Sequence, residues 1–208
     1  INEKINIKIV SPNFDLKYGL NINQIEKKLK KLIKYSEPNR NKETLFIWPE
    51  GVFSGYSYDN ILIFKDLIEK NFSNNHYIIL GVNKLDNNKG LYYNSFLLVD
   101  NRLNIIHQYN KQKLVPFGEF LPFKKILNKF GLKKITEGHE SFLKGDKKIN
   151  IKLDQMNILP LICYEVIFTS LIQQASSDTN LIINISEDAW FGNTIGPDQH
   201  YSKSIFRA

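Results

Sequence analysis

The chain has 208 residues, with 28 lysines and arginines against 21 aspartates and glutamates, a formal net charge of +7. Hydrophobic residues make up 42% and charged residues 24%, values that exclude wholesale disorder and fit one globular domain. No apolar run reaches the roughly 18 residues that a membrane helix needs. The single cysteine, Cys163, excludes an internal disulfide and a multi-cysteine metal site.

The first part of the chain alternates predicted strands and helices. Alternating isoleucines predict an opening strand at residues 5–10. Apolar residues at helical spacing predict a helix over residues 22–34, whose other side carries lysines. Residues 44–48 form a short apolar run that stops at Pro49, as a buried strand does. A second helix is expected over residues 61–71.

The middle of the chain predicts a hairpin followed by a long loop. Residues 77–82 are typical of another buried strand. The runs at 92–99 and 104–109 flank a short turn and therefore predict a hairpin. Residues 111–144 contain several prolines and glycines, so this segment is expected to be mostly loop with one short helix.

The last part returns to alternating elements. Strands are expected at residues 149–153 and 158–162, then a helix at 166–175 and a strand at 181–185. A polar and aromatic loop leads to a last helix that begins near Asp198. Because strands and helices alternate and no repeat or linker divides the chain, the sequence predicts a single α/β domain.

Three side chains that can carry out chemistry come at or just after the ends of predicted strands: Glu50, Lys111 and Cys163. Catalytic residues of α/β sheets commonly lie at the carboxyl ends of strands. A lysine can hold the negative charge that develops on a carbonyl oxygen. A thiol in a tight strand-to-helix turn faces backbone N–H groups and the helix dipole, so we expect its thiolate to be favoured.

Each of these residues also has an ordinary structural interpretation. Glu50 alone is typical of a turn at the surface, Lys111 is one of 28 basic residues, and an unpaired cysteine in an apolar run is usually a core residue. Glu119, set among prolines and phenylalanines, is less typical of a surface charge. Glu165, two residues after the cysteine, indicates a polar pocket.

The order of these residues resembles that of a known enzyme class. Glu50 in WPEG, Lys111 in YNK and Cys163 in ICYE resemble the Glu-Lys-Cys triad of the nitrilase or carbon–nitrogen hydrolase superfamily. The longer segments YNKQKLVPFGEFLPF and SEDAWFGNTIGPDQH resemble the apolipoprotein N-acyltransferase family within it, and the likeness extends over essentially the whole chain. Glu187 stands where that family usually has Asn, which affects local loop contacts rather than the triad.

The resemblance implies a fold and a setting. Residues 1–208 would form a nitrilase-like αββα sandwich, the carbon–nitrogen hydrolase catalytic domain, incomplete at its C-terminal end because closing strands would follow. The domain would be a fragment of a longer membrane protein with transmembrane helices on both sides. The implied location is the bacterial inner (cytoplasmic) membrane, with the catalytic domain on the periplasmic side.

The resemblance also implies a reaction, which is acyl transfer through a thioester. Cys163 would be the nucleophile, Glu50 the general base and Lys111 the oxyanion stabiliser, with Glu119 supporting one of the latter two. A phospholipid would acylate the thiol, and the amino group of an apolipoprotein's diacylglyceryl-cysteine would take the acyl chain at the membrane surface. No cofactor and no nucleic acid are expected to take part.

Other residues receive smaller roles. Tyr164 and Glu165 adjoin the cysteine and are expected to support it. Trp190 and Phe191 could bind the substrate's acyl chain, although neighbouring aromatics are more often core residues. His200 has no carboxylate or cysteine at ligand spacing and is assigned a structural role, so no metal ligand is predicted.

Two other functions and one local feature remain open. A soluble amidase or nitrilase would share the triad and fold but bind a small amide or nitrile, and LVPFGEF and GPDQH argue against it. A non-catalytic, basic surface-binding module would leave Cys163 dispensable. Residues 123–134 combine apolar residues and lysines at helical spacing, which predicts either a packed short helix or an amphipathic arm that enters the membrane surface.

Overall fold

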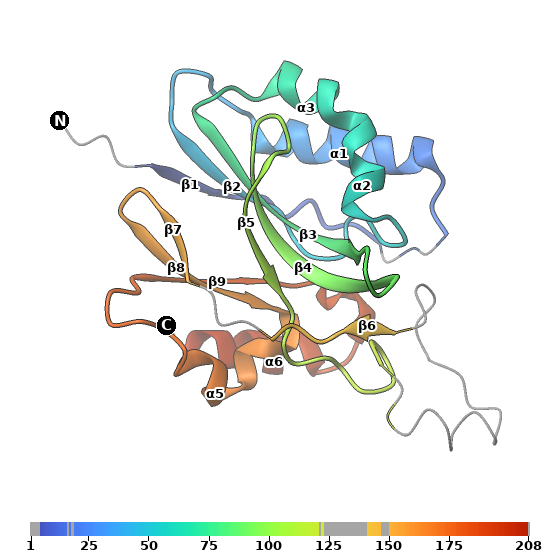
Figure 1. The fold of residues 1–208 in the computed structure, drawn as a ribbon, viewed down its shortest axis with the longest axis vertical. Helices are drawn as coiled ribbons and strands as arrows, with labels where there is room; N and C mark the ends of the chain where they lie inside the picture. Colours follow the sequence, from blue (N-terminus) through green and yellow to red (C-terminus); the bar gives the residue numbers. More distant parts are fainter. Residues whose placement is uncertain are drawn as a thin grey trace.

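The computed structural model of the chain describes residues 5–15, 17, 19–120, 122, 141–146 and 150–207. Two β-sheets face each other in its middle, and helices cover the outer face of each sheet (Figure 1). The strands are β1 (Asn6–Ile9), β2 (Thr44–Ile47), β3 (His76–Asp86), β4 (Leu91–Asp100), β5 (Ile105–Asn110), β6 (Phe142–Leu143), β7 (Ile151–Leu153), β8 (Met156–Ile162) and β9 (Leu181–Ile185). The helices are α1 (Ile22–Ser36), α2 (Tyr58–Ile61), α3 (Lys65–Asn71), α5 (Thr169–Ile172) and α6 (Gly196–Ile205), with 3₁₀ helices η1 (Leu62–Phe64), η3 (Cys163–Ile167) and η4 (Asp188–Phe191). The predicted αββα sandwich is confirmed.

The larger sheet is formed mostly by strands from the first half of the chain. Its strand order is β1-β2-β3-β4-β5, and β6 pairs with β4. The first three strands are parallel, whereas β4 runs antiparallel to both β3 and β5. The predicted hairpin is confirmed as β4 and β5, but β3 extends beyond the apolar run at 77–82 to Asp86, paired with β4 throughout. Cross-strand pairing, rather than burial, holds this polar extension in the sheet.

The smaller sheet has the order β7-β8-β9, and β8 runs parallel to β9. The register pairs Ile162 with Ile185, the last residues of the two strands. The residues that follow, Cys163 and Ser186, therefore leave the sheet at the same edge. This is where the sequence predicts a reactive thiol.

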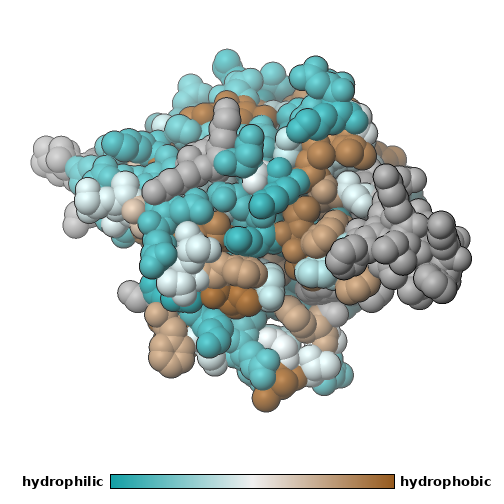
Figure 2. Space-filling view, turned by 60° about the horizontal axis from the view of Figure 1, so that its bottom comes forward, coloured by the Kyte–Doolittle hydropathy of each residue, from teal (hydrophilic) through white to brown (hydrophobic). Residues whose placement is uncertain are grey.

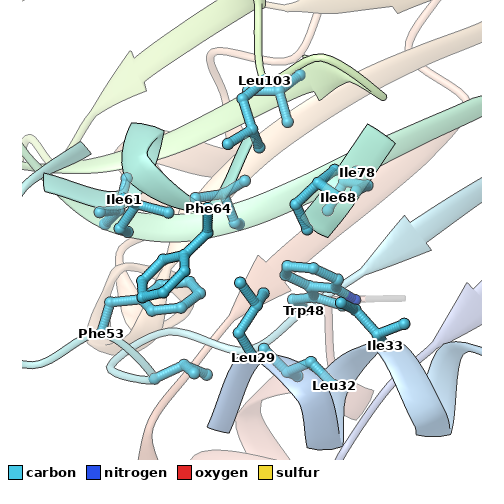
Figure 3. Close-up of a cluster of buried hydrophobic side chains, with 14 of the residues drawn as sticks. Leu29, Leu32, Ile33, Trp48, Phe53, Ile61, Phe64, Ile68, Ile78 and Leu103 are labelled. Carbon is cyan, nitrogen blue, oxygen red and sulfur yellow. The ribbon is translucent and has the colours of Figure 1, made fainter. Parts of the chain in front are cut away.

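Helix α1 covers the larger sheet and begins at a capping box. The side chain of Asn21 accepts a hydrogen bond from the backbone of Gln24, whose own side chain accepts one from Asn21. The buried face of the helix includes Leu29 and Leu32, which point toward Trp48 in the core cluster between helices and sheet (Figure 3). Deep apolar burial of this kind contributes most of the stability of such an amphipathic helix.

The core between the two sheets is separate from the core under α1. Its larger-sheet side includes Leu45, Ile79 and Phe96, and its smaller-sheet side includes Ile158 and Ile183. Strand alternation explains the division, because neighbouring residues of one strand face opposite sides of the sheet. Both faces of the larger sheet are thus buried, which explains why its strands appear in the sequence as continuous apolar runs.

Strand β1 lies at the edge of the larger sheet. The predicted strand is confirmed, but Ile7 is 45% exposed and Ile9 is 76% exposed. Their register partners are Leu45 and Ile47, which face the smaller sheet. Ile7 and Ile9 therefore lie on the same face of the larger sheet as Leu45 and Ile47 and remain exposed there.

Two predicted helices are shorter or more broken than expected. The helix predicted at 61–71 is a series of α2, η1 and α3. The first residues of the helix predicted at 166–175 belong to η3, which starts at Cys163 itself, and α5 covers only Thr169–Ile172. The segment at 111–144 contains β6 and an isolated bridge between Pro116 and Phe120. The amphipathic segment at 123–134 lies outside the described residues.

Helix α6 packs on the outer side of the smaller sheet by a polar face. Its one buried residue is His200, and Arg207 beyond its end donates to the carbonyl oxygens of Val166 and Ile167. Figure 2 turns this side of the molecule forward and shows brown apolar residues among teal ones. None of the helices in the described ranges is long and apolar enough to cross a lipid bilayer.

Candidate active site

Glu50, Lys111 and Cys163 meet where β2, β5 and β8 end. The Nζ atom of Lys111 lies 3.7 Å from Oε1 of Glu50 and 3.0 Å from Oε1 of Glu119. The charge of Lys111 also acts on the thiol of Cys163. Glu50 and Cys163 are more than a hundred positions apart in the sequence, yet they belong to one cluster of polar side chains.

Gly81 allows the two sheets to approach each other closely beside this group of side chains. A Cβ atom at this position would lie 2.8 Å from Cα of Glu50 and 3.0 Å from Cδ1 of Ile185. Real Cβ atoms do not approach a backbone carbon so closely. The glycine in the apolar run of β3 therefore allows the backbone of Glu50 to lie directly over the sheet.

Lys111 is a buried cation between two carboxylates. Its side chain is 2% exposed, and the carboxylates of Glu50 and Glu119 face the same ammonium group. Burial lowers the pKa of Lys111, but the two carboxylates and the nearby thiol raise it more, so that the net direction is upward. The ammonium group therefore stays protonated at neutral pH and provides a fixed positive charge.

Asn94 links the two carboxylates from the middle of β4. Its Nδ2 donates to Oε1 of Glu50 at 2.7 Å and to Oε1 of Glu119 at 2.9 Å. The other carboxylate oxygen of Glu119 accepts from the backbone N–H of Val115. The sequence analysis missed Asn94, although a polar residue inside a buried strand is the signal that could have identified it.

Glu50 is poised to accept a proton. Burial raises the pKa of its carboxyl group, and Glu119 raises it further. The positive charge of Lys111 and the hydrogen bond from Asn94 lower it, and the net shift is upward. A carboxylate with a raised pKa is a stronger base than a surface glutamate, which is the property that a general base needs.

Cys163 has an unusual backbone conformation and a protonated thiol. Its φ of 51° lies in the left-handed region, which residues other than glycine seldom adopt. Burial raises the pKa of the thiol to about 12, and Glu50 adds to the rise. The expectation that the thiolate is favoured is wrong, because a short 3₁₀ helix follows the cysteine and burial outweighs the nearby donors. A base must therefore remove the proton during a reaction.

Glu165 holds two parts of the site together. Its buried carboxylate accepts from the hydroxyl of Tyr109 at 2.9 Å, and from the backbone N–H groups of Gln112, Lys113 and Ile162 at 2.6–3.0 Å. These donors come from β5, from the segment after Lys111 and from the end of β8. Burial raises the pKa of Glu165 more than the hydrogen bonds lower it. The residue positions the loops that carry the lysine and the cysteine.

The aromatic candidates occupy different environments. The ring of Tyr164 packs edge-on against Phe168, with 5.1 Å between centroids, so it contributes to packing beside the cysteine. Phe191 ends η4 and its ring lies 6.4 Å from that of His200. Trp190 lies in the same 3₁₀ helix, but its side chain is outside the described part of the chain. Substrate contact by these residues stays a prediction.

Glu187 adjoins the site through its backbone. Its N–H donates to the carboxylate of Glu50, and its side chain accepts from the N–H of Ala189 at 3.2 Å. The same side chain lies against Gly51, where a Cβ would approach within 2.9 Å. The residue therefore shapes the loop after β9 next to the base.

One group of three side chains in the described ranges offers metal-binding donor types. The thiol of Cys163, the carboxylate of Asp188 and a ring nitrogen of His200 lie within 4.8 Å of one another. The two nitrogens of His200 already face oxygen acceptors, the carboxylate of Asp188 and the carbonyl of Cys163. The imidazole thus has no lone pair directed at a cation, and the assembly is a hydrogen-bonded unit that the sequence analysis did not foresee.

The chain is similar to a known family and to curated enzymes. The model of the Carbon-nitrogen hydrolase family matches residues 17–205. An apolipoprotein N-acyltransferase of Rhizobium leguminosarum bv. trifolii is 34% identical over 80% of this chain and 32% of its own length. One of Wigglesworthia glossinidia brevipalpis is 35% identical over 97% of this chain and 41% of its own length. The chain thus spans about a third to two fifths of these curated relatives.

Solved structures share the fold at low sequence identity. A branch 10 member of the nitrilase superfamily from Saccharomyces cerevisiae superposes with a TM-score of 0.63 at 17% identity, over 98% of this chain and 70% of that one. The glutamine-dependent NAD⁺ synthetase of Acinetobacter baumannii gives a TM-score of 0.61 at 17% identity, over 95% of this chain and 35% of that one. Fold and family model agree, and the chain belongs to the carbon-nitrogen hydrolase family.

Proposed function

We propose that the chain is the catalytic domain of an apolipoprotein N-acyltransferase. It would transfer an acyl chain from a phospholipid to the N-terminal diacylglyceryl-cysteine of an apolipoprotein. One observation carries the proposal: a buried lysine, held between two carboxylates beside a single protonated thiol, in a chain whose curated relatives are apolipoprotein N-acyltransferases. These groups supply a nucleophile, a base and a charge stabiliser, which are the three components that acyl transfer needs.

The first half-reaction acylates the thiol. Glu50 takes the proton from Sγ of Cys163, and the sulfur attacks the ester carbonyl of the phospholipid. Negative charge develops on the carbonyl oxygen, and the ammonium group of Lys111 stabilises it. The C–O bond then breaks, the lysophospholipid leaves as an alcohol with the proton from Glu50, and a thioester remains.

The second half-reaction regenerates the thiol. The amino group of the acceptor attacks the thioester carbonyl while Glu50 takes a proton from the nitrogen. The C–S bond breaks, and the sulfur of Cys163 recovers its proton from Glu50. The sum is an ester plus an amine giving an amide plus an alcohol, so the sequence of steps needs no oxidant and no cofactor.

The burial of the site suits a transferase. Cys163 is 3% exposed and Lys111 is 1% exposed. A thioester in such surroundings meets little water, which limits loss of the acyl group by hydrolysis before the acceptor arrives. Lipid donors and lipid-modified acceptors place the reaction at a membrane surface. The location on the periplasmic side of the inner membrane is part of the same proposal and rests on the likeness to apolipoprotein N-acyltransferases.

The test is an acyl-transfer assay with the full-length protein. Phospholipid vesicles and a diacylglyceryl lipopeptide are mixed with the enzyme, and the N-acylated lipopeptide is quantified by mass spectrometry. A parallel assay offers small amides and nitriles. We expect lipopeptide acylation by the wild type, no acylation by Cys163→Ala, and no hydrolysis of the small substrates.

Two outcomes would contradict the proposal. Hydrolysis of a small amide or nitrile without acyl transfer would identify an amidase or nitrilase. Equal behaviour of wild type and Cys163→Ala, with vesicle binding retained, would identify a non-catalytic module that binds surfaces.

A further inference from the structure

His200 connects the last helix to the cysteine. It is the one buried residue of α6, and its Nε2 donates to the backbone carbonyl of Cys163 at 2.9 Å. Its Nδ1 lies 3.0 Å from Oδ1 and 3.2 Å from Oδ2 of Asp188 in η4. The imidazole thus bridges the loop after β9 and the turn after β8.

The partners of His200 define its protonation. A backbone carbonyl and a carboxylate only accept hydrogen bonds, so both ring nitrogens must carry hydrogens to satisfy both contacts. The hydroxyl of Ser186 donates to the same Asp188 carboxylate at 2.5 Å and keeps it in place. The hydrogen bond to Asp188 raises the pKa of His200 above its usual value, which agrees with an imidazolium.

The contact has a mechanical consequence for the cysteine. The left-handed φ of 51° at Cys163 is a strained conformation for a residue with a side chain. Its carbonyl accepts from His200 and from Nδ2 of Asn184 at 3.2 Å. Two donors on one carbonyl fix the orientation of the peptide and, with it, the direction of the Sγ atom.

The contact also has an electrostatic consequence. The imidazole nitrogen, the carboxylate oxygen and Sγ of Cys163 lie within 4.8 Å of one another. The charged and titratable groups around the imidazole are Asp188 on η4, the Cys163 thiol on η3 and Glu50 after β2. The imidazolium favours a thiolate and the Asp188 carboxylate, within the same 4.8 Å, opposes it, so loss of the imidazolium charge leaves an uncompensated negative charge beside Sγ.

We propose that His200, kept as an imidazolium by Asp188, is a positioning residue for Cys163. It holds the cysteine backbone in its left-handed conformation and offsets the negative charge on Sγ when Glu50 removes the thiol proton. This inference rests on the proposed role of Cys163 as nucleophile. It adds to the site a second cation, which belongs to α6, whereas Lys111 follows β5.

The experiment measures the reactivity of the thiol directly. The full-length protein is treated with iodoacetamide from acidic to alkaline pH, and alkylation of the Cys163 peptide is followed by mass spectrometry. The wild type is compared with His200→Gln, whose amide can still donate to the Cys163 carbonyl but carries no charge. His107→Gln on β5 is the matched control and should alkylate as the wild type does.

The expected signature is a rate ratio that changes with pH. Below the pKa of His200, the wild type should alkylate at least about tenfold faster than His200→Gln, because lowering the thiol pKa by one unit raises the thiolate fraction about tenfold. As pH rises through the pKa of His200, the imidazolium loses its charge and the two rates should converge. A purely structural contact would give the same ratio at every pH.

A second variant keeps the inference testable if His200→Gln does not fold. Asp188→Asn removes the carboxylate that raises the pKa of His200, so the pH at which alkylation loses the contribution of the imidazolium should lie below that of the wild type. A ratio near one, or a ratio that is constant with pH, would overturn the inference. Because alkylation needs no acyl donor, the result is independent of whether Cys163 forms a thioester, and the two proposals can fail separately.

Discussion

Replacing Lys111 by Met is expected to lower acyl transfer by at least about a hundredfold, the usual scale for loss of an oxyanion donor. Met keeps most of the length of the lysine and removes its charge. The structure adds a second effect, because Lys111 is 1% exposed and faces both Glu50 and Glu119. Its removal leaves two carboxylates near each other without a cation, and breaking a buried ion pair typically costs about 3–5 kcal/mol.

The matched control is Lys113→Met. The ammonium group of Lys113 lies over the ring of Phe168, 5.3 Å from its centroid, and only the backbone N–H of this residue contacts Glu165. The substitution should therefore change turnover by less than about fivefold, since a partly exposed cation–π contact contributes only about 0.5–1 kcal/mol. Thermal unfolding of both variants separates lost chemistry from lost fold. If Lys113→Met loses as much activity as Lys111→Met while folded, the assignment of the lysine is incorrect.

Replacing Glu50 by Gln is expected to lower turnover by at least about a hundredfold, the scale for loss of a general base. The amide keeps the shape of the carboxylate, and its oxygen can still accept the hydrogen bond that Asn94 donates to Oε1. The fold should therefore survive. Lipopeptide acylation measured alongside the unfolding temperature checks both points, and a folded Glu50→Gln enzyme with normal turnover would identify a different base.

The pH dependence of the wild type follows from the same residue. Glu50 accepts a proton only when it is ionised, and burial raises its pKa above the ordinary value of 4.5. The acid limb of kcat/KM should therefore lie above that value, with the rate falling as pH falls through the raised pKa. Asn94 donates to the ionised form, so Asn94→Ala should move this limb to higher pH. A limb at the ordinary value in both proteins would argue against Glu50 as the base.

Local sequence patterns can predict the site residues that lie at the ends of strands. Short apolar runs mark β2 and β8, Cys163 directly follows β8, and Glu50 comes three residues after the end of β2. The sheet arrangement brings such ends to one edge, so the position of a residue after a strand carries information about its neighbours in space. The alternation of strands and helices predicts an α/β domain. The αββα sandwich is expected from the resemblance of the longer segments to a known family, and it is confirmed.

Contacts between distant segments could not be predicted in the same way. Asn94 contacts Glu50 across 44 positions, and His200 contacts the carbonyl of Cys163 across 37. No periodicity or spacing links these pairs, because sheet register and helix packing bring them together. The protonation of Cys163 also escaped prediction, since it depends on the balance between burial and the donors around the sulfur.

The most direct measurement of the central claim is capture of the acyl-enzyme. The full-length protein is incubated with phospholipid carrying a labelled acyl chain, without acceptor, and the peptide containing Cys163 is analysed by mass spectrometry. We expect one acyl chain on this residue, released by hydroxylamine and transferred when a lipopeptide amine is added. Cys163→Ser should accumulate little acyl-enzyme, because a hydroxyl is far less acidic than a thiol. An acyl chain on another residue, or normal turnover by Cys163→Ala, would contradict the account.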